Sequence, residues 1–205
     1  MATEHTPQET KEAPQSDYVS TVVKTKFGMS GSILATKDEE GHNHYVTILD
    51  AEVGGPSQFV QLVDLLYHAK EGDVVTIRIY SFGGWVETGL NICQAISATR
   101  AKVITVGMSI VASIAAVIWM AGHERKMLPG SVLMVHMPSG GQFGKTMDIE
   151  EECRQLNEFF ADFLHRIGKG IITDEEFERI ITKREDTFIP AEKINKRLAA
   201  MGGDN

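Results

Sequence analysis

A serine and a histidine in two apolar segments are the residues of this sequence best suited to nucleophilic chemistry. Ser113 lies within residues 103–122, a run of twenty residues without a charged side chain, and His136 lies in the apolar run SVLMVHM. A serine hydroxyl becomes an effective nucleophile when a neighbouring base takes its proton, and a neutral histidine can do this near neutral pH. A carboxylate that orients the histidine and stabilises the imidazolium completes such a system. The residue types therefore permit hydrolysis through serine, if the fold brings them together.

The uncharged run that contains Ser113 is better explained by a strand and a helix than by a membrane span. Its length does match a spanning helix. However, residues 103–106 are β-branched and typical of a buried strand, whereas residues 112–121 are rich in alanine and favour a helix. Gly107 and Ser109 in the middle would weaken membrane insertion. We therefore predict that Ser113 lies at a strand-to-helix junction, beside backbone N–H groups that the helix leaves free.

Two further features fall at the ends of predicted strands. The strand predicted at 74–80 is followed by the pair Gly83–Gly84, where the backbone can approach a ligand closely. His136 directly follows a strand predicted at 132–135. The carboxyl ends of parallel strands meet at one edge of the sheet, which is where open α/β folds bind ligands. Taken alone, the same residues also fit a packed serine, a core histidine and an ordinary turn, so these patterns leave the function open.

Strand and helix patterns alternate along the chain, which predicts an α/β fold with a largely parallel sheet. The other predicted elements are a hairpin within 18–37, a strand at 45–49, a helix after Ser57 as its N-cap, helices at 86–99, 148–167 and 174–182, and a final helix opened by Pro190. The helix at 148–167 is the longest of these. Its apolar residues Ile149, Cys153, Leu156, Phe160, Phe163 and Ile167 follow one another at intervals of three and four, as one continuous stripe.

The composition is that of an ordinary globular protein. The chain has 205 residues, 42% hydrophobic and 23% charged, and its net charge of −8 disfavours nucleic acid and anionic lipid as partners. Cys93 and Cys153 provide neither a disulfide framework nor a zinc spacing, so we expect a cytoplasmic protein without a metal site or a cofactor. Residues 1–17 are polar and predict a disordered or processed tail rather than a secretory signal, which leaves 18–205 as a single domain.

Four motifs resemble those of the proteolytic subunit of the Clp protease. The similarity extends over roughly residues 45–191. The motifs are Ala112-Ser113-Ile114 before an alanine-rich helix that ends at Gly122, Leu128-Pro129 before an apolar strand and His136-Met137-Pro138, the turn Ser81-Phe82-Gly83-Gly84, and the segment Arg184-Glu185-Asp186-Thr187-Phe188.

This resemblance implies a role for each of five residues. Ser113 would be the nucleophile, His136 the general base and Asp186 the orienting acid, with the N–H groups of Gly83 and Ile114 as oxyanion donors. The implied fold consists of the repeated strand–strand–helix units of the Clp protease and crotonase superfamily, with a protruding long helix.

The implied activity is hydrolysis of peptide bonds in unfolded proteins through an acyl-enzyme. By the same resemblance, the chain would assemble with itself into two stacked seven-membered rings, and an AAA+ unfoldase would supply the substrates. No phosphate-cradling loop is found in the sequence, so any use of ATP would belong to that partner.

The sequence also departs from the family pattern close to the expected site. Ser109 and Ala115 stand where the family has glycine, Phe82 replaces the proline of the turn, and Arg184-Glu185 reverses the order of two charges. Two alternatives therefore remain: a catalytically silent ring subunit, and an acyl-CoA enzyme of the crotonase fold. The second of these shares the oxyanion arrangement but lacks the serine–histidine pair.

Overall fold

The computed structural model describes residues 21–23, 33–139 and 146–202. The predicted tail at 1–17, the turn of the N-terminal hairpin and most of the glycine-rich link after Ser139 lie outside these residues. The described part is a mixed α/β structure, as the sequence predicts.

The core of the fold is one sheet, in the order β1-β2-β3-β4-β5-β7-β8 with β6 beside β5. The described strands are β1 (Thr21–Val23), β2 (Ile33–Lys37), β3 (Asn43–Leu49), β4 (Val74–Ser81), β5 (Lys102–Ala112), β6 (Glu124–Met127), β7 (Val132–Val135) and β8 (Thr187–Pro190). The central pairs β3–β4, β4–β5, β5–β6 and β5–β7 are parallel. The pairs β1–β2, β2–β3 and β7–β8 at the two edges are antiparallel. A largely parallel sheet is therefore confirmed.

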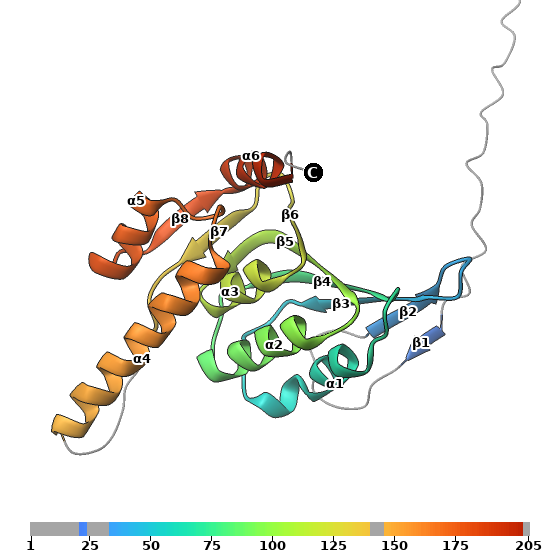
Figure 1. Ribbon diagram of the computed structural model, residues 1–205, viewed down its shortest axis with the longest axis horizontal. Helices are drawn as coiled ribbons and strands as arrows, with labels where there is room; N and C mark the ends of the chain where they lie inside the picture. Colours follow the sequence, from blue (N-terminus) through green and yellow to red (C-terminus); the bar gives the residue numbers. More distant parts are fainter. Residues whose placement is uncertain (1–20, 24–32, 140–145, 203–205) are drawn as a thin grey trace, which may run out of the picture.

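Helices connect the strands. They are α1 (Val60–His68), α2 (Val86–Ala98), α3 (Ile114–Ala121), α4 (Thr146–Ile167), α5 (Asp174–Phe177), which continues into the π-helical turn η2 (Glu178–Thr182), and α6 (Ala191–Met201). Figure 1 shows α1, α2 and α3 in a row against the strands, while α4 extends away from the body.

Helix α3 is buried on all sides, which explains why the run around Ser113 carries no charge. Each of its residues from Ile114 to Met120 is at most 1% exposed. Thr105 Oγ1 donates a hydrogen bond to the carbonyl of Trp119 (2.7 Å), and Trp119 Nε1 donates to the carbonyl of Lys126 (3.1 Å). In the part of the chain that the structure describes, no helix has the length and apolarity needed to cross a membrane. The predicted strand and core helix are thus confirmed.

Some sequence predictions of local structure were wrong. Ser57 lies in the 3-10 turn Pro56–Gln58, and α1 begins only after Phe59, without a side-chain cap. Pro190 is the N-cap of α6 and the last residue of β8, rather than the first helical residue. Strands β6 and β8 were not predicted. Both are short, and charged side chains fill most of β6.

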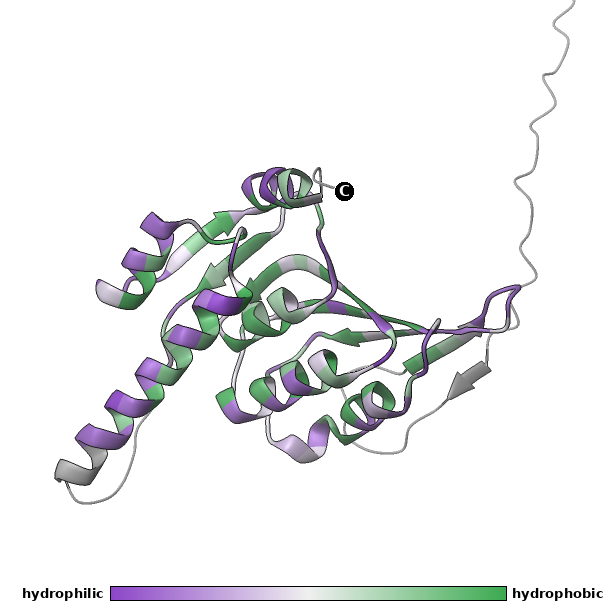
Figure 2. Ribbon diagram, viewed as in Figure 1, coloured by the Kyte–Doolittle hydropathy of each residue, from purple (hydrophilic) through white to green (hydrophobic). Residues whose placement is uncertain are grey.

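The apolar stripe of α4 meets the core only in the second half of the helix. Phe160 and Leu164 are buried, whereas Cys153 and Leu156 are exposed. In Figure 2 most of the extended part of α4 is hydrophilic. The long helix therefore protrudes, as expected, and its first half leaves Leu156 uncovered by the described chain.

Candidate active site

Ser113 occupies the joint between β5 and α3 in an unusual backbone conformation. Its φ is 57° and its ψ is −132°. A non-glycine residue in such a region costs about 1–3 kcal/mol and persists where the surroundings determine it. The Ser113 N–H donates to the carbonyl of Met134 (2.9 Å), and the Ser113 carbonyl accepts from the N–H of Ala116 (2.9 Å). The residue is therefore fixed to β7 on one side and to the first turn of α3 on the other.

Strand β5 reaches this position by changing its partner. It pairs with β6 from Ile104 to Gly107 and with β7 from Ile110 to Ala112. Between these two ladders lies Ser109, with a φ of 51°. A left-handed residue bends the strand, and glycine adopts this conformation most easily. Ser109 therefore makes this bend at a steric cost.

His136 follows β7 and lies next to the serine. His136 Nε2 and Ser113 Oγ are 2.7 Å apart, and 21% of the histidine side chain is exposed. The parallel register pairs Ala112 with Met134. The residues that come directly after these two strands therefore lie at the same edge of the sheet. The structure therefore brings these two predicted residues within hydrogen-bonding distance.

Asp186 lies on the other side of the histidine ring. The antiparallel register pairs Val135 with Thr187, so His136 and Asp186 are the next residues at that end of the two strands. Asp186 Oδ1 is 3.9 Å from His136 Nδ1, and 61% of the aspartate side chain is exposed. This distance exceeds that of a hydrogen bond. The acid is near the histidine but does not contact it directly.

The turn after β4 touches Ser113 from a third side. Gly83 has a φ of 100°, and a Cβ atom built on it would lie 2.6 Å from Ser113 Cβ and 3.1 Å from Ser113 Oγ. Val53 holds the turn, because its N–H donates to the Gly83 carbonyl (2.8 Å) and its carbonyl accepts from the N–H of Trp85 (2.6 Å). Only glycine fits between this turn and the serine.

The possible oxyanion donors differ in their availability. The Gly83 N–H donates to Ser81 Oγ (3.1 Å), and that hydroxyl donates to the carbonyl of Ala51 (2.6 Å). For the Gly84 N–H, no acceptor is found among the described residues. Ile114 is the first residue of α3, where an N–H has no acceptor within the helix. The role of the Gly83 N–H as an oxyanion donor therefore stays a prediction. The Gly84 N–H is a second candidate for this role, and the pair of adjacent glycines in the sequence is the signal that could have suggested it.

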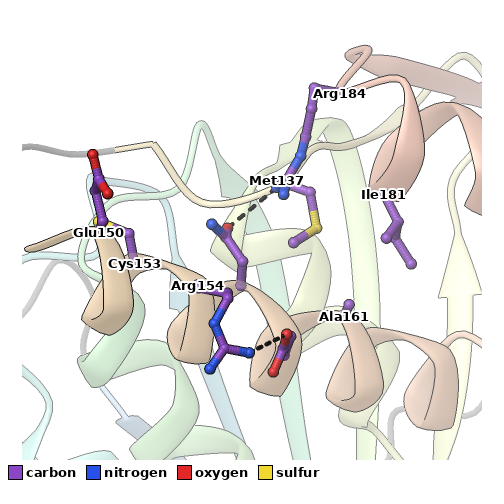
Figure 3. Close-up of a pocket in the computed structure, with 9 residues that line it drawn as sticks. Met137, Glu150, Cys153, Arg154, Ala161, Ile181 and Arg184 are labelled. Carbon is purple, nitrogen blue, oxygen red and sulfur yellow. Dashed lines mark hydrogen bonds and ion pairs between the residues drawn. The ribbon is translucent and has the colours of Figure 1, made fainter. Parts of the chain in front are cut away.

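A pocket of about 500 Å³ opens between α4 and the segments that carry His136 and Asp186. Figure 3 shows Glu150, Cys153, Arg154 and Ala161 on α4, with Met137 and Arg184 entering from the opposite side. Met137 follows His136 in the chain, and Arg184 is two residues before Asp186. Residues close in sequence to both His136 and Asp186 therefore line the pocket, although neither of these two residues does so itself.

The two reversed charges before Asp186 have partners within the chain. Arg184 has a φ of 57°, and its Nη1 donates to Asn157 Oδ1 of α4 (3.2 Å). Glu185 accepts from Arg179 Nε (2.9 Å), and its N–H donates to the carbonyl of Arg179 (2.9 Å). These contacts fix the segment that leads into Asp186 to both α4 and η2.

Among the described residues, no group of three or more His, Cys, Asp and Glu side chains is arranged to hold a metal ion.

Comparison with known proteins adds a family to this geometry. Residues 55–195 match the model of the Clp protease family. The chain is 34% identical over 138 residues to ATP-dependent Clp protease proteolytic subunit 3 of Rhizobium meliloti (strain 1021). The aligned residues make up 66% of this chain and 62% of that relative. The chain is 38% identical over 123 residues to the ATP-dependent Clp protease proteolytic subunit of Bacteroides thetaiotaomicron, which covers 56% of each protein.

The chain thus spans about three fifths of the length of the curated relatives that it matches. The matched region contains the joint at Ser113, the histidine after β7 and the acid before β8. These matches favour neither the silent ring subunit nor the acyl-CoA enzyme. Because the family model matches more than half of the sequence, including the joint at Ser113, the chain belongs to the Clp protease family.

Proposed function

We propose that this protein is a serine peptidase that hydrolyses peptide bonds through an acyl-enzyme. Ser113 is the nucleophile, His136 the general base and Asp186 the acid that orients the histidine. The observation that carries the proposal is the 2.7 Å separation between His136 Nε2 and Ser113 Oγ. A nucleophile and a base within hydrogen-bonding reach are the first requirement of this chemistry.

The reaction follows from the positions of these atoms. His136 Nε2 takes the proton of Ser113 Oγ while the oxygen attacks the peptide carbonyl carbon. The negative charge that develops on the carbonyl oxygen is stabilised by the N–H of Ile114 and by an N–H of the Gly83–Gly84 turn. The imidazolium then gives its proton to the leaving amine, which leaves an ester on Ser113. A water molecule, deprotonated by the same histidine, hydrolyses that ester and restores the serine.

Asp186 acts on this cycle through the histidine. A carboxylate near Nδ1 stabilises the imidazolium and selects the tautomer whose Nε2 accepts a proton. At 3.9 Å and with 61% of its side chain exposed, Asp186 interacts with His136 more weakly than a buried, hydrogen-bonded acid would. Its contribution to the rate is accordingly the smallest of the three.

We further infer that the working form is an assembly of copies that an ATP-dependent unfoldase supplies with unfolded polypeptide. Two relatives carry the words "ATP-dependent Clp protease" in their names, which supports this inference. The uncovered first half of α4, with Leu156 55% exposed, also supports contact with another copy. Light scattering of the purified chain measures the number of copies. The cytoplasmic location stays a prediction.

A fluorophosphonate probe tests the peptidase assignment directly. The assembled protein is treated with the probe, and the adduct is mapped by mass spectrometry. We expect modification at Ser113, no modification in Ser113→Ala and much slower modification in His136→Ala. Ser97→Ala is the matched control, because Ser97 is an exposed serine of α2 away from the site, and its labelling should equal that of the wild type.

Cleavage of short fluorogenic peptides by the same samples completes the test. Loss of cleavage in Ser113→Ala, with cleavage retained in Ser97→Ala, is the expected pattern. If the assembled wild type neither reacts with the probe nor cleaves peptides, the peptidase assignment is wrong.

A further inference from the structure

A groove of about 740 Å³ lies on the surface at a distance from the proposed catalytic residues. It is bordered by α2, by the connection from α3 to β6 and by the second half of α4, elements that lie next to one another in Figure 1. We call it the basic groove, because His123, Arg125, Arg166 and Lys169 line it. Neither Ser113, His136 nor Asp186 is among its lining residues. Whatever it binds therefore does not depend on the peptidase assignment.

The charge of the groove contrasts with that of the chain. The protein has a net charge of −8, yet no Asp or Glu lines this groove. Within the described residues, none of the four basic side chains forms an ion pair. The acidic neighbour in the sequence, Glu124, is held instead by Lys102 (2.7 Å) and Lys126 (2.9 Å). The positive charge of the groove is thus left without a counterpart in this part of the chain.

Two of the basic side chains have a hydrogen-bonding capacity that the described chain does not use. Arg125 Nη1 donates to the carbonyl of Met120 (3.3 Å), but Arg125 Nε is buried without a hydrogen-bond partner. Burial also lowers the pKa of Arg125, which reflects the cost of a poorly solvated charge. His123 Nδ1 accepts the N–H of Val103 (3.0 Å), so the proton of the neutral ring is on Nε2. An anionic group in the groove would supply acceptors for both residues.

The groove also offers apolar surface. Phe159 is 53% exposed, and its ring is stacked with that of Phe163 at a centroid separation of 6.3 Å. The guanidinium of Arg166 lies over Phe163, 5.3 Å from the ring centroid. Leu90 and Ile167 are further apolar residues of the lining. A small inorganic anion would leave this surface uncovered, whereas an apolar side chain beside a carboxylate would cover it.

We propose that the basic groove binds a polypeptide segment in which apolar side chains are flanked by carboxylates. The apolar side chains lie against Phe159 and Phe163, and the carboxylates pair with the basic side chains at the rim. A groove between helices is a common site for an amphipathic segment, with apolar anchors in the groove and charges along its edges. Charge complementarity selects an acidic segment over a neutral or basic one.

The test measures binding of a short, labelled peptide of alternating glutamate and leucine or phenylalanine by fluorescence anisotropy. The comparison peptide has glutamine in place of each glutamate. The test variant is Arg166→Gln/Lys169→Gln, in which both residues are exposed, and the control is Lys193→Gln/Lys196→Gln on α6, which removes the same charge from an exposed surface. The wild type should bind the acidic peptide, and the test variant should bind it about tenfold more weakly. The control should equal the wild type.

Two further measurements exclude other occupants. Phe159→Ala should weaken the same peptide, because an exposed aromatic anchor is lost while the charges remain. A single-stranded oligonucleotide should not compete. The proposal is overturned if the glutamine peptide binds equally well, if the oligonucleotide displaces the acidic peptide, or if the test variant binds like the wild type. It is also overturned if the test variant changes the number of copies in light scattering, because the groove is then an interface between copies.

Discussion

His136 and Asp186 face each other across the end of the β7–β8 pair, with 3.9 Å between Nδ1 and Oδ1. The neighbouring pair, Val135 and Thr187, belongs to the ladder itself, so the backbone rather than a side-chain hydrogen bond sets this distance. An acid held in this way acts on the histidine mainly through its charge.

Asp186→Asn should therefore reduce kcat/KM by about 10²-fold, at the low end of the range for acid–base groups. Removal of a buried triad aspartate costs about 10⁴-fold in a well-studied serine protease, where the aspartate accepts a hydrogen bond. Steady-state cleavage of a fluorogenic peptide measures the change, and Asp64→Asn, at an exposed position of α1, should leave the rate unchanged. An unchanged rate in Asp186→Asn would remove this residue from the mechanism.

Gly83→Ala should abolish fluorophosphonate labelling of Ser113. The new methyl group would lie 2.6 Å from Ser113 Cβ. The backbone φ of 100° at this position is also one that residues with a side chain rarely adopt. The matched variant is Gly130→Ala, since Gly130 has a φ of 79° but nothing within 4 Å of its Cβ position. Gly130→Ala should lose about 1 kcal/mol of stability from backbone strain and keep its labelling. Equal labelling of the two variants would mean that Gly83 does not limit access to the serine.

Ser109→Gly should stabilise the fold. Ser109 adopts a φ of 51° at the bend of β5, which costs a residue with a side chain about 1–2 kcal/mol. Glycine avoids this cost but loses about 0.5–1 kcal/mol through the greater freedom of its unfolded chain, so the net gain should be about 0.5–1 kcal/mol. Denaturant unfolding measures the difference. Ser109→Ala retains the Cβ atom and should show no such gain, and an equal gain in both variants would assign the effect to the hydroxyl instead.

Asp73 should make the fold sensitive to acid. The residue is 3% exposed, and its carboxylate accepts hydrogen bonds from the N–H of Asn43 (2.8 Å), Asn43 Nδ2 (3.1 Å) and the N–H of Lys70 (2.9 Å). Burial alone would raise the pKa of Asp73, but these hydrogen bonds outweigh it and hold the pKa below its ordinary value of 3.8.

Because the pKa of Asp73 is lower in the folded state, its stabilising effect is complete above pH 3.8 and is lost as the pH falls below that value. Asp73→Asn should cost about 1–3 kcal/mol at pH 7 and progressively less below the ordinary pKa. Denaturant unfolding of the wild type and the variant, measured at pH 7 and below pH 3.8, gives the cost at each pH. Asp50→Asn at an exposed position is the control. A cost that does not depend on pH would show that the charge of Asp73 contributes nothing.

The sequence predicted those parts of the fold that rest on local patterns. The strand and helix around Ser113 follow from a change from β-branched residues to alanine, and the helix α4 follows from a regular apolar spacing. Strand β6 carries the sequence ERKM, and β8 ends in a proline at the edge of the sheet, so neither has an alternating pattern. They are strands because β5 and β7 offer hydrogen-bonding partners. Such partners are not visible in a local window of sequence.

The candidate site was predictable only in part, for the same reason. The residue types at Ser113 and His136 permit a nucleophile and a base, but their contact depends on β5 lying beside β7. The resemblance to a known family assigned these two residues their roles as nucleophile and base, without showing which strands lie side by side. It did not supply the bond from the Gly83 N–H to Ser81 Oγ, because a hydroxyl two residues away competes for the amide only in this turn geometry.

The change of partner along β5 limits how this protein can evolve. The bend accepts a residue with a side chain, because Ser109 stands there with a φ of 51° at a local steric cost. A single inserted or deleted residue between Gly107 and Ile110 would have a much larger effect, since successive side chains of a strand point to opposite faces. It would turn Ile110, Val111 and Ala112 over and direct Ser113 away from His136. We therefore expect descendants of this chain to vary in residue type at the bend while its length stays constant.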